Sequence, residues 1–287
     1  MFDPKRHLQS LNRAKQIAHA GDDFLMERTI EDMLERLSAI NRTFDNAIAL
    51  FGRNDSLAKS MTSCPQIKNT MRVEEKVHKG LADHIVEADN MMLEPNSVDL
   101  VLAPLGLHWI NDLPGALVQL HRAIRPDGLL MAVLPGPDTL QELRDTLLIA
   151  ESEVSGGAAM RVDPFTDIRD AGGLLQRAGF ALPVVDRDDV TVRYSTPFDL
   201  INDLRKMGAN GQLRSRPPIL SRETIGRLES TYADHYADSD GRLRATFSLI
   251  SMSGWVPHES QQRPLKPGSA KTRMADALKV DEVKLKP

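Results

Sequence analysis

The chain has 287 residues, 41% of them hydrophobic, a formal net charge of −4 at pH 7 and a single cysteine. This length and apolar content are sufficient for one large α/β domain and argue against full disorder. The slightly acidic balance gives no electrostatic case for nucleic-acid binding, and the lone Cys64 excludes an internal disulfide and a zinc site of paired cysteines.

The N-terminal stretch MFDPKRHLQSLNRAK is basic but lacks the apolar run of a secretory signal. No stretch approaches the roughly 20 apolar residues of a membrane span. We therefore expect a soluble, cytoplasmic protein with no membrane span and no nucleic-acid partner. Residues 22 to 40 place apolar side chains at helical spacing, which predicts an amphipathic helix with Asp22 as its N-cap.

Short apolar runs and turns alternate over the next part of the chain. Residues 46 to 51, NAIALF, are typical of a buried parallel strand, and residues 55 to 61, DSLAKSM, predict a helix. Residues 64 to 69, CPQIKN, and 82 to 89, ADHIVEAD, predict two further short strands. Such alternation favours a doubly wound sheet.

A βαβ unit follows. Residues 97 to 110 predict a strand that runs into an irregular loop, residues 112 to 124 an amphipathic helix, and residues 125 to 135 a turn and a second buried strand. Two more helices are expected, at residues 138 to 152 and 166 to 178.

The pattern changes in the last third of the chain. Residues 184 to 194 and 245 to 256 alternate like strands, and they enclose predicted helices at 197 to 208 and 221 to 237. Two late strands around a helical insert suggest an antiparallel hairpin at the edge of the sheet. From about Arg263 the chain gains Lys and Pro and loses apolar periodicity, which is typical of a mobile extension.

In an open α/β sheet, ligands bind beyond the carboxyl ends of the strands, where the strand order reverses. The candidate positions therefore directly follow predicted strands, and they are Phe51 to Asp55, Asn69 and Thr70, Asp89 and Asn90, Pro104 to Trp109, and Pro135 to Asp138.

Two of these groups have a specific chemistry and a plain structural alternative. Asp89 and Asn90 can hydrogen-bond an adenine, although both residue types also favour turns. His108 and Trp109 could wall an adenine pocket or contact a substrate. The alternative for them is a Trp packed on the rim of the sheet beside a hydrogen-bonded His.

The order of several motifs resembles a known family. The stretch LGLHWINDLPGALVQLHRAIRPDGLL, followed by GPDTLQELR, is similar to class I S-adenosylmethionine methyltransferases. Within them it resembles the malonyl-carrier methyltransferase of biotin synthesis and the methyltransferase-like assembly factor of respiratory complex I. The later stretches DPFTDIRDAGGLLQRAGF, DLRKMGAN, SGWVPHESQQRP and KPGSA favour the assembly factor family, and the resemblance spans about residues 20 to 270.

This resemblance implies an α/β fold with a doubly wound, seven-stranded Rossmann-like methyltransferase sheet. The implied division is an N-terminal helical segment (1–40), a methyltransferase-like core (41–196), a helical insert (197–244), a final strand (245–262) and a flexible tail (263–287). The best-known family member is associated with hydroxylating an arginine on an iron-sulfur subunit of complex I. The implied partner is thus a protein, a complex I subunit, at the periphery of the respiratory membrane.

The cofactor site of the family is matched only in part. Its third-strand acid corresponds to Asp89, with Asn90 beside it, and its loop after the fourth strand corresponds to Leu105 through Trp109, which includes His108. The acid expected at the end of the second strand is missing, because QIKNTM offers only Asn69 and Thr70 there.

The glycine-rich first loop of the family falls on residues 49 to 55, ALFGRND, where Gly52 is the single glycine. Phe51, Arg53 and Asp55 take glycine positions, and each non-glycine residue forced to positive φ costs roughly 1–2 kcal/mol. Asp55 would also repel the carboxylate of the cofactor unless it is paired, whereas Arg53 could pair with that carboxylate. S-adenosylmethionine is therefore expected to bind weakly or not at all.

Further candidates face the substrate or a partner and come mostly from the second half of the chain: Trp109, Tyr194, Asp203, Met207, Trp255, His258 and Glu259. Core packing is an equal alternative for Met207 and Trp255. His108 and His258 are far apart in sequence and no His-x-Asp/Glu pair suggests an iron triad, so no metal site is predicted. No catalytic residue is assigned.

Three functions stay open from the sequence. The first is an arginine-modifying enzyme of complex I assembly with a remodelled cofactor site. The second is an assembly chaperone that keeps the fold without the cofactor. The third is ordinary methyl transfer, including transfer to a malonyl carrier protein, against which the loop ALFGRND weighs.

Overall fold

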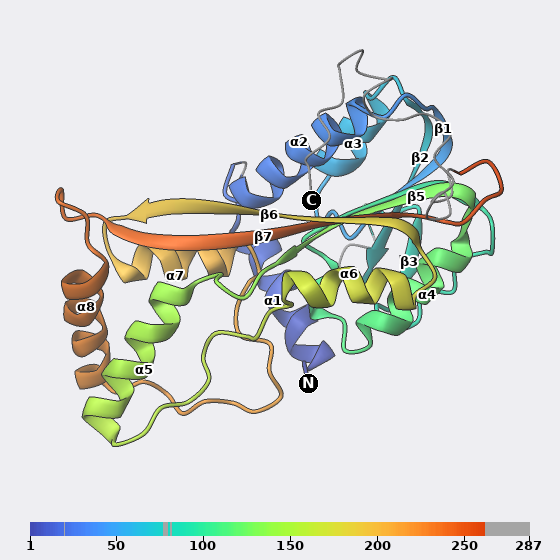
Figure 1. Cartoon of the computed structure of the whole chain (residues 1–287). Helices are drawn as coiled ribbons and strands as arrows, with labels where there is room; N and C mark the ends of the chain where they lie inside the picture. The colour runs from blue at the N-terminus through green and yellow to red at the C-terminus, as the bar shows by residue number, and fades with distance from the viewer. Residues whose placement is uncertain (20, 77–79, 81, 262–287) are drawn as a thin grey trace, which may run out of the picture. The chain divides into compact units, whose positions relative to one another are not determined.

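The computed structural model describes residues 1–19, 21–76, 80 and 82–261. The chain divides into a large compact unit, residues 1–257, and a short one that begins at His258. The large unit contains a seven-stranded sheet with the strand order β3-β2-β1-β4-β5-β7-β6 (Figure 1). This confirms the expected doubly wound α/β architecture.

The strands β1 to β5 are parallel, and β7 runs antiparallel between β5 and β6. The strands are β1 (Phe44–Leu50), β2 (Ile67–Glu75), β3 (His84–Val86), β4 (Val98–Pro104), β5 (Ile124–Pro135), β6 (Ala181–Tyr194) and β7 (Leu243–Trp255). The predicted antiparallel hairpin is confirmed, with β6 as the edge strand. The strand order reverses between β1 and β4, so the switch point where ligands bind lies there.

Helices cover both faces of the sheet. They are α1 (Pro4–Ile17), α2 (Phe24–Ser38), α3 (Ser56–Thr62), the short 3-10 helix η2 (Leu107–Trp109), α4 (Leu113–Ala123), α5 (Gln141–Ser155), α6 (Ile168–Arg177), α7 (Pro197–Lys206) and α8 (Arg222–Tyr236). Figure 1 shows α2 and α3 on one face, with α4 and α6 on the other.

The central strands are apolar over most of their length because helices cover both faces of the sheet there. Ala49 of β1 and Leu102 of β4 belong to the core under α2 and α3. Ile48 of β1 and Val101 of β4 belong to the core under α4 and α6. Successive strand residues point to opposite faces, so one short apolar run supplies both cores.

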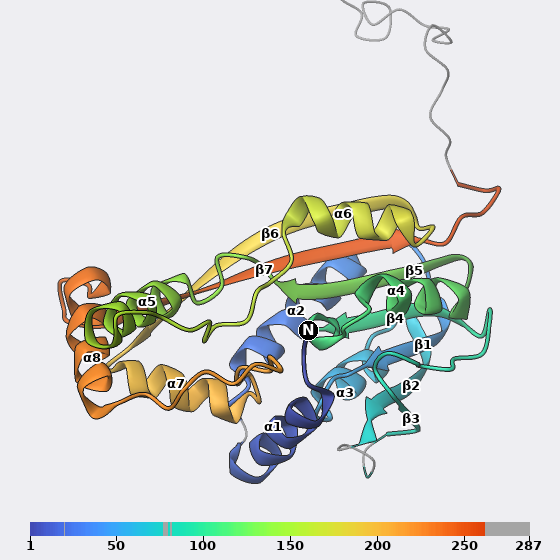
Figure 2. The ribbon, with the colours of Figure 1, turned by 90° about the horizontal axis from the view of Figure 1, so that it is seen from below.

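The β6–β7 pair extends past the end of β5. The last residue of β5, Pro135, pairs with Leu249, whereas the β6–β7 ladder continues to Tyr194 and Leu243. Helices α5, α7 and α8 pack around this extension, as Figures 1 and 2 show. Together these elements build a wall beyond the carboxyl ends of the parallel strands.

The N-terminal segment is bound to that wall and to the loop after β4. Phe2 forms an antiparallel bridge with Leu213, and the backbone N–H of Asp3 donates to the carbonyl of Gln212 at 2.8 Å. The side chain of Asn111 accepts hydrogen bonds from the Met1 amine and from the Phe2 N–H, both at 2.8 Å. Helix α1 then contacts α7 (Figure 2).

Two local predictions are wrong. Strand β2 does not end near Asn69 but runs from Ile67 to Glu75, because it pairs with β1 along its length. The N-cap of α2 is Asp23 rather than Asp22, whose side chain instead accepts from the His19 N–H at 2.8 Å and from Lys206 at 2.9 Å.

The division of the chain into five parts stays a prediction, and the tail from 263 to 287 lies outside the described residues. Among the helices that the structure describes, none has the length and apolarity required to cross a membrane.

Candidate functional site

A cavity of about 250 Å³ lies beyond the carboxyl ends of β1, β4 and β5. The turn after β1 contributes Arg53 to its lining, and the loop after β4 contributes Leu105, His108 and Trp109. The rest of the lining comes from the start of α2, Pro135 at the end of β5, the segments 139–147 and 161–165, residues 201–211 of α7 and the turn after it, Leu220, and Phe247 of β7. The walls are mainly apolar. In such a cavity the few polar groups are the candidates for orienting a ligand.

At two of the three positions where the resemblance implies glycine, the turn after β1 adopts a left-handed backbone, whereas Asp55 has a φ of −78°. Phe51 and Arg53 have φ values of 55° and 58°, although neither is glycine. Phe51 is buried, and a Cβ placed on Gly106 would lie 2.5 Å from the Cβ of Phe51. The missing side chain of Gly106 therefore lets Phe51 pack against the loop after β4, and this packing helps to hold the strained turn.

Arg53 is bound by other parts of the protein. Its guanidinium Nη1 donates to the backbone carbonyl of Met207 at 2.6 Å, and Nη2 lies 3.7 Å from a carboxylate oxygen of Asp23. Its backbone N–H donates to Glu74 at 3.3 Å. The side chain thus joins the turn after β1 to α2 and to the end of α7.

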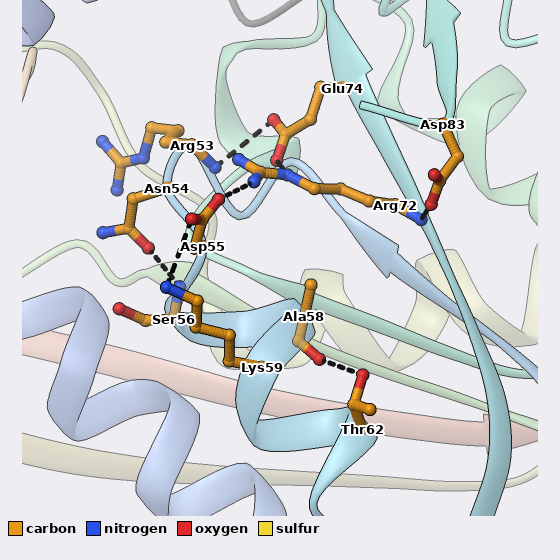
Figure 3. A network of polar contacts seen from close by, with 10 residues as sticks. All are labelled: Arg53, Asn54, Asp55, Ser56, Ala58, Lys59, Thr62, Arg72, Glu74 and Asp83. Atoms are coloured by element: carbon orange, nitrogen blue, oxygen red, sulfur yellow. Dashed lines mark hydrogen bonds and ion pairs between the residues drawn. The ribbon is translucent and has the colours of Figure 1, made fainter. Parts of the chain in front are cut away.

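A network of charged side chains connects this turn to strand β2 (Figure 3). Arg72 is 5% exposed and Glu74 is 1% exposed, and their side chains are joined by a 2.9 Å contact from Nε to Oε1. Arg72 also bonds Asp55 at 2.5 Å, and Asp55 pairs with Lys59 at 3.3 Å. Burial raises the pKa of Glu74, while hydrogen bonds from Lys59 and Arg72 lower the pKa of Asp55. The Asp55 carboxylate is therefore paired within the protein.

Strand β2 ends on an acidic residue, Glu75, although no acid was expected there. Asn69 pairs in register with Asn46 near the start of β2, and its side chain donates to the carbonyl of Asp45. The structure thus separates Asn69 from the other cofactor candidates. Glu75 is the last residue of β2, and its carboxylate lies 2.9 Å from Nε2 of His7 in α1. The sequence signal for it was the run MRVEE, which a strand ending at residue 69 excludes.

His108 and Trp109 lie together in η2, with ring centroids 4.2 Å apart. Nδ1 of His108 is buried and has no hydrogen-bond partner among the described residues. Burial, and then the electrostatic effect of Arg53, hold the pKa of His108 well below its usual value. Trp109 also contacts the rings of Phe2 and His7, with centroids 5.9 and 5.4 Å away. His108 is therefore a neutral imidazole in the cavity wall.

Asp89 and Asn90 form a turn outside the cavity lining. The N–H of Asn90 donates to the carbonyl of Glu87 at 2.9 Å, and both Asp89 and Asn90 are exposed. An Asp89 oxygen accepts from the N–H of Asp112 at 3.4 Å. The turn alternative describes their geometry, and a role in cofactor binding stays a prediction.

The partner-facing candidates are dispersed. Met207 lines the cavity, whereas Tyr194 is buried at the end of β6 outside the lining, where burial and then the Asp203 carboxylate raise its pKa. Trp255 lies at the opposite end of the sheet, where it pairs with Leu129 at the start of the apolar part of β5. Strand β7 runs antiparallel and carries Trp255, its last residue, away from the cavity, and a role of Trp255 toward a partner stays a prediction.

His258 and Glu259 belong to the short second unit. Nδ1 of His258 lies 2.7 Å from the hydroxyl of Ser260. Their role toward a substrate or partner stays a prediction.

The sequence interpretation missed the acids of the cavity. Asp163 is 5% exposed and its Oδ2 accepts from the N–H of Gln212 at 2.8 Å. Asp23 lies at the start of α2 in the same lining, and Arg161 in that lining pairs with Glu151 at 2.5 Å. The only sequence signal for Asp163 was an acid in the apolar, proline-containing stretch RVDPF. Among the described residues, no group of three or more His, Cys, Asp or Glu side chains could hold a metal ion.

Comparison with known proteins gives three further findings. A family model described as a methyltransferase domain matches residues 58–132, which begin just after the strained turn. The zebrafish protein named arginine-hydroxylase NDUFAF5, mitochondrial, is 35% identical over 269 residues, which cover 91% of this chain and 84% of that protein. The malonyl-[acyl-carrier protein] O-methyltransferase of Laribacter hongkongensis is 34% identical over 183 residues, which cover 63% of this chain and 59% of that enzyme.

The solved structures agree on the fold. A candidate methyltransferase from Bacillus halodurans C-125 superposes with a TM-score of 0.51 at 13% identity, covering 79% of this chain and 98% of that one. At this identity the likeness shows the fold alone.

Proposed function

The chain belongs to the arginine-hydroxylase NDUFAF5 family, and on this premise we propose that it modifies an arginine side chain of a partner protein. The partner proposed from the family resemblance is an iron-sulfur subunit of respiratory complex I. The chain would then work in the cytoplasm, at the periphery of the respiratory membrane.

One observation carries this proposal over methyl transfer. The match to the arginine hydroxylase covers 91% of the chain, whereas the match to the malonyl-carrier enzyme covers 63%. A fold by itself would not decide between the two reactions.

We further propose that S-adenosylmethionine is held weakly or not at all in its ordinary position. Glu75 and Asp89 are acids after the second and third strands, which fits a nucleoside. Three features oppose a good fit: the side chains of Phe51 and Arg53 at positive φ, the Arg53 guanidinium bound to Met207, and the His7 contact with Glu75. Because these residues fit the group poorly, no reaction step is assigned through it.

Hydroxylation inserts one oxygen atom into a C–H bond and removes two electrons from the arginine side chain. The oxidant must therefore come from outside the chain. The residues lining the cavity can bind and orient the side chain and exclude water, and the neutral His108 offers an uncharged nitrogen beside it.

The alternative is an assembly chaperone of the same fold that performs no chemistry. The observation that favours it is the strained turn, which occupies the place of a glycine-rich loop with two large side chains.

Mass spectrometry of the partner subunit separates the proposals. Cells that lack the chain should lose one oxygen atom from a single arginine of the subunit, and returning the chain should restore it. Complex I assembly that is rescued without any oxygen on that arginine would favour the chaperone. Rescue of a biotin-requiring strain would favour ordinary methyl transfer to a carrier protein.

A further inference from the structure

The cavity contains a buried carboxylate that lacks a partner on one side. Asp163 is 5% exposed and lies in the segment between α5 and α6. Its Oδ2 accepts a hydrogen bond from the Gln212 N–H, but its Oδ1 has no hydrogen-bond partner among the described residues. A buried carboxylate oxygen without a donor is destabilising, so its presence in a ligand cavity indicates a donor that arrives with the ligand.

The neighbouring guanidinium groups are paired through their Nη atoms, while Nε of Arg53 and Nε of Arg161 have no hydrogen-bond partner among the described residues. Arg161, which also lines the cavity, pairs with Glu151 at 2.5 Å and donates to the carbonyl of Pro218 at 2.8 Å. Arg53 donates to Met207 and faces Asp23. Burial raises the pKa of Asp163, although the backbone hydrogen bond from Gln212, the charge of Arg6 and the backbone N–H of Leu213 oppose this shift. The cavity therefore keeps an excess carboxylate.

A second acceptor lies at the start of α2. Oδ1 of Asp23 is buried and has no hydrogen-bond partner among the residues that the structure describes, while its Oδ2 faces Arg53 at 3.7 Å. The acids Asp23 and Asp163 come from segments 140 residues apart in the chain, and both line the one cavity. The cavity thus has two unpaired carboxylate oxygens beside three buried donors without a partner among the described residues, Nε of Arg53, Nε of Arg161 and Nδ2 of Asn210.

The remaining lining suits an extended aliphatic stem. Leu140, Leu143, Phe165 and Phe247 are among its apolar residues. Its volume of about 250 Å³ is just below the roughly 300 Å³ at which sites for whole small molecules begin. This size fits one long side chain better than a complete nucleoside cofactor.

We propose that this cavity binds the side chain of an arginine, with Asp163 as the residue that receives the guanidinium and Asp23 as a second acceptor. A guanidinium presents five N–H donors in a planar fork that matches carboxylate oxygens, while its three methylene groups pack on apolar walls. The choice of arginine over other cations rests on the proposed function. The assignment of the two acids rests on the cavity itself.

Gly211 provides a way to test the cavity without touching the acid. A Cβ at Gly211 would lie 3.7 Å from Oδ1 of Asp163 and 3.5 Å from the carbonyl of Arg161, which are ordinary contact distances. Gly211 does not have a positive φ, so alanine is not strained there. Gly211→Ala therefore narrows the space at the free oxygen and leaves the carboxylate in place.

Calorimetry and thermal shift on the full chain test the proposal with three blocked amino-acid amides. N-acetyl-arginine amide should bind at least tenfold more tightly than N-acetyl-citrulline amide, which has the same shape without the charge, and more tightly than N-acetyl-lysine amide. Asp163→Asn should weaken binding of the arginine compound at least tenfold, and Gly211→Ala several-fold. Asp234→Asn, on the exposed side of α8, is the matched control and should leave binding unchanged.

Equal binding of the citrulline compound, or equal binding of the lysine compound, would overturn the assignment of an arginine site. The assignment would also be overturned if Gly211→Ala bound the arginine compound as tightly as the unchanged protein and Asp163→Asn did so too. The same holds if Gly211→Ala bound it as tightly and Asp163→Asn did not fold. The test does not depend on turnover. If the arginine compound binds as expected while no oxygen appears on the partner, the proposed function fails and the binding site stands. If oxygen is added with an unchanged KM in Asp163→Asn, the binding site fails and the function stands.

Discussion

The guanidinium of Arg53 donates a 2.6 Å hydrogen bond to the backbone carbonyl of Met207, which lies 154 residues further along the chain. This bond joins the turn after the first strand to the end of the helical insert. Arg53 also holds a positive φ of 58°, so the same residue is strained in its backbone and bonded through its side chain. The two sides of the cavity are therefore joined by a residue at a position where the family resemblance implies a glycine.

The strain at Arg53 can be measured with two substitutions. Arg53→Gly and Arg53→Ala both remove the bond to Met207, but only glycine relieves the left-handed backbone. Relief of about 1–2 kcal/mol exceeds the roughly 0.4–1 kcal/mol that glycine adds to the entropy of the unfolded chain. In urea unfolding, Arg53→Gly should therefore be the more stable of the two by about 0.5–1 kcal/mol. Asn54 does not have a positive φ, so Asn54→Ala should be at least as stable as Asn54→Gly. If glycine were the more stable substitution at both positions, backbone strain at Arg53 would not explain the difference.

The buried pair of Arg72 and Glu74 predicts strong coupling. Arg72→Met leaves the carboxylate of Glu74 buried without its main cation and should lower the free energy of unfolding by about 3–5 kcal/mol. The double variant Arg72→Met with Glu74→Met should lose much less, because no buried charge remains. Lys59→Met, at the exposed end of the network, should change stability by less than about 1 kcal/mol. Additive effects of the two buried substitutions would show that the pair is not coupled.

His108 predicts a loss of stability in mild acid. Its pKa is held well below 6.5 in the folded protein, so below pH 6.5 the unfolded chain takes up a proton that the folded protein does not. Stability is complete above that pH and falls as the pH drops, by up to about 1.4 kcal/mol per unit. Urea unfolding at about pH 7.5 and about pH 5.5 should give a smaller difference for His108→Gln than for the unchanged protein. His235→Gln, at an exposed position on α8, is the control, and an unchanged slope in His108→Gln would refute the prediction.

The contact between His7 and Glu75 predicts that α1 competes with a nucleoside. His7→Ala frees the carboxylate at the end of β2, which can then accept hydrogen bonds from ribose hydroxyls. Calorimetry should show several-fold tighter binding of S-adenosylhomocysteine to His7→Ala than to the unchanged protein. Gln9→Ala, on the exposed side of α1, should have no effect. If His7→Ala binds no better than Gln9→Ala, the helix does not limit access to this acid.

Local patterns were sufficient for most elements of the fold. The run NAIALF predicted β1, and the alternation of residues 184 to 194 predicted β6. Both predictions work because burial on one or both faces of a strand sets the pattern of apolar residues along it. The composition of the turn ALFGRND likewise indicated left-handed residues without glycine, and Phe51 and Arg53 adopt them. By contrast, β2 was placed too early, because IKNTMRVEE is polar over its first half and is a strand only through its pairing with β1.

The sequence by itself thus determined the order of helices and strands and the unusual turn after β1, beside the switch point of the sheet. Only the tertiary structure decided which polar groups meet there. Trp255 is carried to the opposite end of the sheet by the antiparallel direction of β7, whereas Asp23 and Asp163 converge on one cavity from distant segments. Whether a carboxylate oxygen has a donor depends on the packing of segments far apart in the chain, and periodicity within one segment carries no record of it.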